Sequence, residues 1–162
     1  MTFQIRRAAE RDLPVLGQLG ALLMRTHYWF DPARFIRAGE GAEDGYAWFL
    51  RTQLEQDDVA IFVAEREGAA IAYLYAGVEP MSWKELRDES GFIHDVVVTE
   101  GARRGGVAAA LIDTATQWFA ERGIARVMLW TAAPNAGAQR LFERLGFRRT
   151  MIEMTKELKI ED

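Results

Sequence analysis

Residues Gly91 to Gly123 read GFIHDVVVTEGARRGGVAAALIDTATQWFAERG, and this stretch decides the fold. It opens with a mostly apolar run, 92–98, whose length and β-branched residues are typical of a strand buried on both faces. A basic, glycine-rich turn follows at 101–106, and apolar residues then recur at helical spacing until Gly123. The stretch therefore predicts a strand, a glycine turn and a helix in succession.

The turn between this strand and this helix has the features of a phosphate-binding site. The first turn of a helix leaves about four backbone N–H groups without partners and carries partial positive charge. Residues 101–106 contain no Ser, Thr, Asp or Asn that could cap the helix, and the glycines permit close approach of a ligand to the backbone. The alternative interpretation is that a glycine caps the helix and both arginines are simply solvated. The turn lacks the Gly-Lys-Ser/Thr of a Walker loop and the G-x-G-x-x-G of a dinucleotide fold.

Two motifs resemble those of the GCN5-related N-acetyltransferase (GNAT) superfamily. Residues 103–108, Arg-Arg-Gly-Gly-Val-Ala, are similar to the family's coenzyme motif Gln/Arg-x-x-Gly-x-Gly/Ala, and Val98 fills the aliphatic position five residues before it. Asn135-x-x-Ala138 and the segment 141–147, LFERLGF, resemble the family's second motif. The resemblance implies one α/β domain over 1–162. Its sheet would be mostly antiparallel with splayed parallel strands 4 and 5, flanked by helices.

The same resemblance implies an activity and a co-substrate. Acetyl-CoA would donate an acetyl group to a primary amine of a small molecule or protein, by direct attack in a ternary complex. Backbone groups at the strand end would pair with the pantetheine arm, and the glycine turn would hold the pyrophosphate. The coenzyme-binding residues implied in this way are Val96, Val97, Val98, Arg103, Arg104, Gly105, Gly106, Val107, Ala108, Asn135 and Phe142.

A general base is expected on the strand, because an alkylamine with a pKa near 10.4 is mostly protonated at neutral pH. Asp95 and His94 are the two polar residues within the apolar run, and strand alternation places them on opposite faces. An acidic residue of this strand often removes the proton in the family, so Asp95 is the first candidate and His94 the second. Glu79 and His27 are weaker candidates. Asp95 and His94 could instead bond to neighbouring loops and only hold the strand end.

The chain departs from the family pattern at Phe142. Many members have a Tyr seven residues after the Asn as general acid, and phenylalanine cannot donate a proton. One alternative is that Tyr73, Tyr75 or a water protonates the leaving thiolate. The other is that the thiolate leaves as an anion, because a thiol with a pKa of about 8.5 is an adequate leaving group near neutral pH. The departure keeps a second function open: a GNAT-like acyl-CoA-binding module with little or no turnover. Acyl transfer to a hydroxyl is a third.

The remaining sequence predicts further elements around this unit. The aromatic-rich segment 27–45 reads as irregular, forming either a wall of the acceptor pocket or a plug of the core, and 81–90 as a helical turn or a loop. The predicted helices run from about Leu13 to Arg25, from an N-cap at Asp44 to Gln56, and from Asn135 to Gly146. The predicted strands cover 3–7, 59–65, 70–78, 125–132 and 147–158.

Composition narrows the possible functions. The chain has 162 residues and no cysteine, which excludes disulfides, thiolate zinc sites and a cysteine nucleophile, and its two histidines give little basis for a metal site. A net charge of -4 and a pI near 5.3 argue against nucleic-acid binding and mildly favour a cationic substrate. No membrane span or signal peptide is recognisable, so we expect a cytoplasmic location and no membrane partner. The family resemblance suggests a homodimer.

Overall fold

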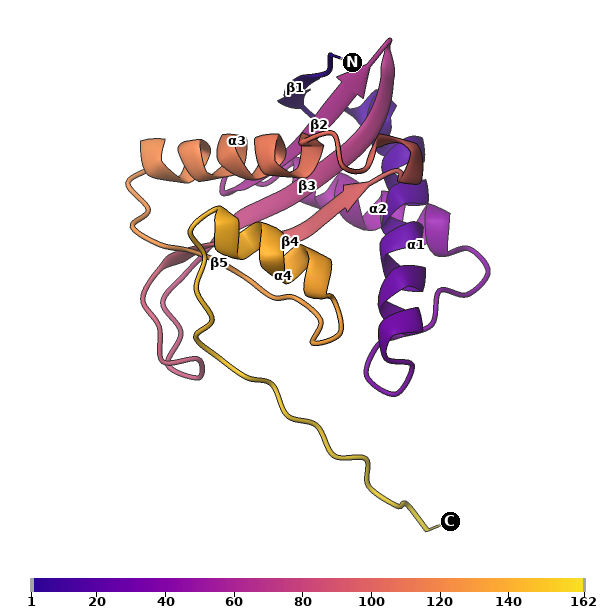
Figure 1. Cartoon of the computed structure of the whole chain (residues 1–162), viewed down its shortest axis with the longest axis vertical. Helices are drawn as coiled ribbons and strands as arrows, with labels where there is room; N and C mark the ends of the chain where they lie inside the picture. The colour runs from indigo at the N-terminus through magenta and orange to yellow at the C-terminus, as the bar shows by residue number, and fades with distance from the viewer. Residues whose placement is uncertain (1, 162) are drawn as a thin grey trace.

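A computed structural model describes residues 2–161 and arranges them around one five-stranded sheet (Figure 1). Met1 and Asp162, the two ends of the predicted domain, lie outside the described residues. The strand order is β1-β2-β3-β4-β5, with β4 and β5 parallel and every other pair antiparallel. This confirms the predicted mixed sheet with parallel fourth and fifth strands. The strands are β1 Gln4–Arg7, β2 Val59–Arg66, β3 Ala69–Glu79, β4 Ser90–Val98 and β5 Val127–Leu129.

Helices cover both faces of the sheet and create two cores. On one face, α1 and α2 pack against β2 side chains such as Ile61 and Val63. On the other face, α3 packs against alternate residues of the same strand, including Phe62 and Ala64, and α4 adds partly buried residues at the edge of this core. Because both faces are covered, the central strands are mostly apolar. The helices are α1 Leu13–Phe30, α2 Ala42–Leu54, α3 Val107–Glu121 and α4 Ala136–Arg144, with short 3-10 helices η1 Glu10–Asp12 and η2 Glu100–Ala102.

Helix α1 is longer than predicted, because it continues past Arg25 to Phe30. The prediction that 27–45 is irregular is therefore wrong for its first four residues, and it is also wrong for its last four, 42–45, which lie in α2. The helix ends where Asp31 adopts an extended conformation, with φ -157° and ψ 91°. The next residue is Pro32, whose ring disfavours helical backbone in the residue before it. The stop signal was thus present in the sequence, because Pro32 stands seven residues beyond the predicted end at Arg25.

Helix α2 begins earlier than predicted, at Ala42, so Asp44 lies in the first turn and is not the N-cap. Gly41 takes the N-cap position with φ +81°, a left-handed conformation that suits glycine. The helix packs unusually close to α1. A Cβ at Gly20 of α1 would lie 2.1 Å from the ring of Tyr46, and one at Gly17 would lie 2.3 Å from the Glu43 carbonyl oxygen. The two glycines therefore set the distance between the helices.

The C-terminal part of the chain differs most from the prediction. Strand β5 is limited to Val127–Leu129 instead of 125–132, and residues 147–158 form no strand. No helix or strand follows Arg144 in the described residues, and the chain leaves the body as an extended tail (Figure 1). The physical reason is that a strand needs a hydrogen-bonding partner, and this segment pairs with none.

The connections between elements contain little regular structure. Residues 81–89 form a loop with one isolated bridge between Ser82 and Arg87, which agrees with the loop alternative for 81–90, and Ser90 already belongs to β4. Among the helices in the described part of the chain, none is long and apolar enough to cross a membrane.

Candidate active site

The glycine turn lies between β4 and α3, where the sequence places it. Gly106 is the N-cap of α3 with φ +78°, and no side chain caps the helix. The first intrahelical hydrogen bond is donated by the N–H of Ala110 to the carbonyl of Gly106 at 3.1 Å, which leaves the preceding N–H groups free of helical partners. A Cβ at Gly106 would meet no atom within 4 Å, so the space beside this backbone is open. Uncapped N–H groups facing open space fit the pyrophosphate of a coenzyme.

The arginines of this turn have different positions. Arg104 has a left-handed backbone with φ +67°, and its side chain is exposed. The Nε of Arg103 donates a hydrogen bond to the carbonyl of Val98 at 3.3 Å, which ties the turn to the end of β4. Val107 is almost fully buried in the core under α3, so only its backbone is available to a ligand.

Strand β4 has a free edge next to the glycine turn. It pairs with β5 only from Gly91 to Ile93, opposite Val127 to Leu129. Beyond Ile93, β4 pairs with β3 alone among the described residues, so Val96–Val98 have no strand partner on the β5 side, where the Val98 carbonyl accepts from the Arg103 side chain. An extended, amide-containing ligand such as a pantetheine arm could hydrogen-bond to that edge as an added strand would. The free edge and the turn are adjacent, since Arg103 of the turn bonds to the carbonyl of Val98.

A β-bulge at His94 changes the direction of the polar side chains. The register of β3 with β4 runs from the pair Tyr75–Asp95 to the pair Ala76–Ile93, so His94 is the extra residue. His94 packs its ring against Tyr75, and Asp95 bonds to Tyr73, two tyrosines that belong to the same core under α1 and α2. The prediction that His94 and Asp95 point to opposite faces is therefore wrong, because the bulge interrupts strand alternation.

Asp95 lies beneath the surface, within the core on the side of α1 and α2. It is 8% exposed, and its Oδ2 accepts hydrogen bonds from the hydroxyls of Tyr73, at 2.8 Å, and Tyr46. Burial raises the pKa of the Asp95 carboxyl, and the two tyrosine hydrogen bonds oppose that rise. Burial also raises the pKa of both tyrosine hydroxyls, and the negative charge of Asp95 raises it further. The three side chains form a closed network that connects β3, β4 and α2.

His94, in contrast, faces two hollows in the surface. Its Nε2 lies 3.2 Å from the Oε1 of Glu79, and its ring is 4.8 Å from the ring of Tyr75 and 5.8 Å from that of Phe92, centre to centre. The imidazole is therefore oriented by a carboxylate and held between two aromatic rings, which is the arrangement expected of a general base.

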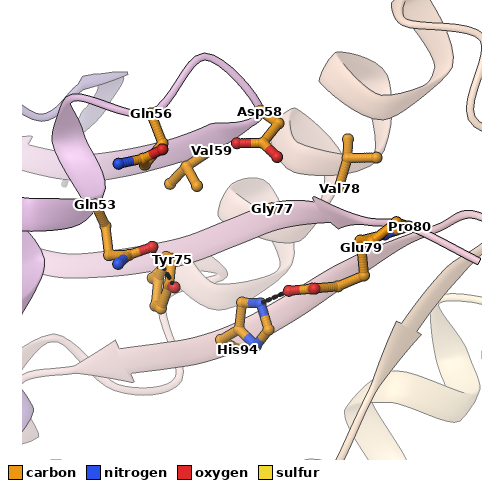
Figure 2. Close-up of a pocket in the computed structure, with 10 residues that line it drawn as sticks. All are labelled: Gln53, Gln56, Asp58, Val59, Tyr75, Gly77, Val78, Glu79, Pro80 and His94. Atoms are coloured by element: carbon orange, nitrogen blue, oxygen red, sulfur yellow. Dashed lines mark hydrogen bonds and ion pairs between the residues drawn. The ribbon is translucent and has the colours of Figure 1, made fainter. Parts of the chain in front are cut away.

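The first hollow has a volume of about 320 Å³ and lies between the end of α2, the start of β2, the end of β3 and the middle of β4 (Figure 2). Its lining is polar: Gln53, Gln56 and Asp58 face Glu79 and His94 across it. The hydroxyl of Tyr75, at its floor, donates to the Oε1 of Gln53 at 2.8 Å, and burial raises the pKa of this hydroxyl to about 12.

The second hollow, of about 270 Å³, lies where β4 and β5 separate. His94 and Glu79 line it together with Phe92, Ile93 and the exposed Trp130. The His94–Glu79 pair thus stands between the two hollows and is shared by both.

Three other residues predicted from the sequence, His27, Asn135 and Phe142, make structural contacts away from the His94–Glu79 pair. The Nδ1 of His27 is bonded to the Leu23 carbonyl within α1 at 2.9 Å, and its ring packs against Phe35. The Oδ1 of Asn135 accepts from the N–H of Ala138 at 3.2 Å and caps α4. Phe142 packs against the core on the α3 side, with its ring 6.0 Å from that of Phe147.

Sequence reasoning missed several residues of the site, namely Tyr46, Gln53, Asp58 and Trp130. Gln53 and Gln56 follow Tyr46 by seven and ten residues, a spacing that puts all three on one side of a helix and its extension. That spacing was a usable signal. No local pattern connects Tyr46 with Asp95, because they are 49 residues apart and meet only through the close packing of α1 and α2.

Comparisons with known proteins identify the family of this chain. The model of the acetyltransferase (GNAT) family matches residues 21–147. An uncharacterized N-acetyltransferase of Methanocaldococcus jannaschii is 31% identical over 90% of this chain and 61% of its own length. A mycothiol acetyltransferase of Amycolatopsis mediterranei is 29% identical over 67% of this chain. The chain spans only 61% and 34% of the lengths of these two relatives.

Solved structures share the fold along nearly the whole chain. A GCN5-related N-acetyltransferase from Ralstonia eutropha has 26% identity and a TM-score of 0.74, covering 97% of this chain and 99% of that one. An aminoglycoside 6'-N-acetyltransferase from Acinetobacter haemolyticus has 22% identity and a TM-score of 0.73, covering 98% and 99%. The sheet order, the glycine turn and the family match lead to one conclusion: the chain belongs to the acetyltransferase (GNAT) family.

Proposed function

We propose that this chain is an N-acetyltransferase that moves an acetyl group from acetyl-CoA to a primary amine, with His94 as general base and Glu79 as its orienting partner. The observation that carries the proposal is the His94–Glu79 pair, shared by two hollows at the point where β4 leaves β5. Acetyl-CoA is the co-substrate. The free edge at Val96–Val98 and the turn from Arg103 to Ala108 are the groups that would hold it.

The acceptor is a cationic amine. The first hollow contains the carboxylates of Asp58 and Glu79, and amide groups of Gln53 and Gln56 supply further hydrogen-bonding atoms. Two carboxylates beside one imidazole attract an ammonium group and offer it a proton acceptor in the same place. A small amine or the amino group of a protein side chain or terminus satisfies these requirements.

From the ammonium form, the nitrogen loses two protons and the leaving thiolate takes up one, so one proton is released to solvent overall. His94 takes the first proton from the bound ammonium and passes it to solvent, and the neutral amine attacks the thioester carbonyl carbon. The new C–N bond forms, the C–S bond breaks, and the amide nitrogen loses its second proton to His94. The coenzyme thiol leaves as a thiolate, since a thiol pKa of about 8.5 makes it an adequate leaving group.

None of the tyrosines near the site is a good acid for that thiolate. Burial raises the pKa of Tyr75 to about 12, so proton transfer from its hydroxyl to a thiolate is unfavourable. Tyr73 is fully buried, and its hydroxyl is committed to Asp95. Phe142 has no proton to give. We therefore propose that the thiolate is protonated by water.

The test is thiol release from acetyl-CoA with a panel of amines, comparing His94→Gln with Asp95→Asn. We expect His94→Gln to lower kcat by about 10² or more while acetyl-CoA affinity stays the same. Asp95→Asn keeps an oxygen acceptor for both tyrosines and should retain most of the rate. A 100-fold loss in Asp95→Asn, with folding and binding intact and His94→Gln active, would transfer the base to Asp95.

The competing function is an acyl-CoA-binding module without turnover. It predicts that acetyl-CoA binds and that no amine of the panel, including a diamine, an aminoglycoside and a peptide with a free N-terminus, releases thiol. That result would refute the enzyme proposal while leaving the coenzyme site in place.

A further inference from the structure

The two aromatic rings that contact His94 are each held in turn by a polar side chain. The bulge leaves His94 out of the pairing between β3 and β4, so no cross-strand partner fixes the direction of its side chain. The contact with Glu79 fixes the imidazole at one atom, Nε2, and leaves the ring free to turn about that point. The plane of the imidazole is therefore set by Tyr75 and Phe92, whose rings lie against it.

Tyr75 is fixed by Gln53 of α2. Its hydroxyl donates to the Oε1 of Gln53 at 2.8 Å, and Figure 2 shows the tyrosine between Gln53 and His94. The ring of Phe49, one helical turn before Gln53, meets the Tyr75 ring edge-on at 5.9 Å, centre to centre. Tyr75 is only 8% exposed, so these contacts hold a ring that is closely surrounded. Gln53 thus determines where one wall of the imidazole stands.

Phe92 is fixed by Arg87, in the loop between β3 and β4. The guanidinium carbon lies 5.0 Å from the centre of the Phe92 ring, within the range of a cation–π contact. The guanidinium is itself immobilised, because Nη1 donates to the carbonyls of Pro80, at 2.8 Å, and Asp88, at 3.3 Å, and Nη2 pairs with Glu85 at 2.7 Å. The Arg87 side chain is 11% exposed, a low value for an arginine. A nearly buried, fully anchored cation thus holds the second wall.

We propose that Gln53 and Arg87 are positioning residues for the base His94. They act through the two rings, which set the plane of the imidazole. Since the Glu79 carboxylate accepts, Nε2 carries the hydrogen, and Nδ1 is the nitrogen left to take a proton, with its lone pair in the ring plane. A tilted ring would direct that lone pair away from the acceptor amine. This role depends on the proposed function, since it takes His94 as the base.

Proton NMR of the full chain measures the position of the imidazole without activity. The chain has two histidines, so His27→Gln identifies the signals of His94. Aromatic ring currents shift these signals, which are compared at the basic end of a pH titration, where the imidazole is neutral. We expect them to move toward those of an unstacked histidine in Gln53→Leu and in Arg87→Met. Gln53→Glu retains an oxygen acceptor for the tyrosine hydroxyl and should leave them in place.

Two controls are matched to these variants. Gln56→Leu removes the other glutamine of the first hollow, whose amide bonds to the Thr52 carbonyl and not to Tyr75. Lys84→Met removes an exposed cation from the same loop as Arg87. Both should leave the His94 signals unchanged. Unmoved signals in Gln53→Leu and Arg87→Met, with circular dichroism showing an intact fold, would overturn the proposal whatever the activity.

Kinetics then test whether the plane matters for the reaction. Gln53→Leu and Arg87→Met should each lower kcat about 10-fold with acetyl-CoA affinity unchanged. Because Gln53 also lines the first hollow, kcat and not KM is its readout. Tyr75→Phe, which deletes one oxygen atom, should match Gln53→Leu, and the two together should lower kcat no further, since both remove one hydrogen bond.

A variant of the base separates the two ideas. In a His94→Gln background, neither Gln53→Leu nor Arg87→Met should lower kcat again, because no imidazole remains to be positioned. Moved NMR signals with an unchanged kcat, in an enzyme that loses its rate in His94→Gln, would overturn the positioning role. A fully active His94→Gln would refute the proposed base, which is a different failure and one that the NMR signals do not depend on.

Discussion

At the scale of single residues, the candidate site depends on one extra residue in β4. The bulge at His94 puts the imidazole beside Glu79 at the surface and leaves Asp95 beneath it, bonded to two tyrosines. Two neighbouring polar residues thereby acquire different environments, one accessible and one buried. The family resemblance favoured the acidic residue as base, whereas the geometry favours the histidine.

Asp95 is expected to lower the free energy of unfolding as pH rises, whereas most carboxylates do the opposite. Burial raises the pKa of its carboxyl in the folded state, so its contribution to stability is full below the ordinary value of about 4 and is lost as pH rises through the raised value. Asparagine cannot ionise. The free energy of unfolding of Asp95→Asn, relative to wild type, should therefore rise with pH from about 4 and then level off. Urea denaturation between pH 4 and 8 measures this. A relative stability that falls with pH would mean that the tyrosine hydrogen bonds outweigh burial.

Asp12 provides the opposite case. Its carboxylate accepts two hydrogen bonds from Arg6, at 2.8 and 2.9 Å, and one from the N–H of Ala9 at 2.7 Å, and the Arg6 guanidinium lowers the pKa of Asp12. The stabilisation is present above pH 4 and is lost as pH falls through the lowered value. Asp12→Asn should cost about 1–3 kcal/mol at pH 7, with the cost shrinking below pH 4. Exposed Asp57→Asn is the control and should change stability by less than about 0.5 kcal/mol.

At the scale of helices and strands, the contact between α1 and α2 holds the buried network in place. Gly20 gives the ring of Tyr46 the space from which its hydroxyl reaches Asp95. Gly20→Ala would place a methyl group 2.1 Å from that ring and should destabilise the fold by about 1–3 kcal/mol. Gly45→Ala, in α2 with nothing within 4 Å of its Cβ position, should instead stabilise by about 0.5–1 kcal/mol. Chemical denaturation measures the stability of both variants. An unchanged stability in Gly20→Ala would show that the two helices can move apart at no cost.

The same scale shows what the sequence could and could not predict. The succession β4, glycine turn and α3 was correct because each of its signals is local: an apolar run, two adjacent glycines and a helical repeat. The bulge at His94 was not visible, since strand alternation is read from one strand and a bulge is a property of two. The segment 147–158 has a strand pattern, but pairing depends on which edge is available, and no pattern within the segment specifies that.

At the scale of the whole molecule, coenzyme binding should be coupled to folding. The glycine turn, the β4 edge and α3 are positioned only in the folded chain, so acetyl-CoA at 100 times its dissociation constant should add about 2.7 kcal/mol to the free energy of unfolding. Gly106→Ala should reduce this gain, because alanine is strained at φ +78° and the N–H groups of the turn would shift. Gly101→Ala, at an ordinary φ with open space around it, is the matched control. Melting curves with and without acetyl-CoA provide the measurement, and a gain unchanged in Gly106→Ala would place the pyrophosphate elsewhere.

The sheet also separates the proposed donor site from the first hollow, so residues of the two can change independently. The glycine turn belongs to the face covered by α3, whereas the first hollow is lined from the other face, by the end of α2 and the loop that follows it. Mutations at Gln53, Gln56 or Asp58 can therefore accumulate without disturbing the donor site. A lineage descended from this chain could exchange one acceptor for another by substitutions at these three residues, while the turn and strand edge proposed to hold the acetyl donor stay unchanged.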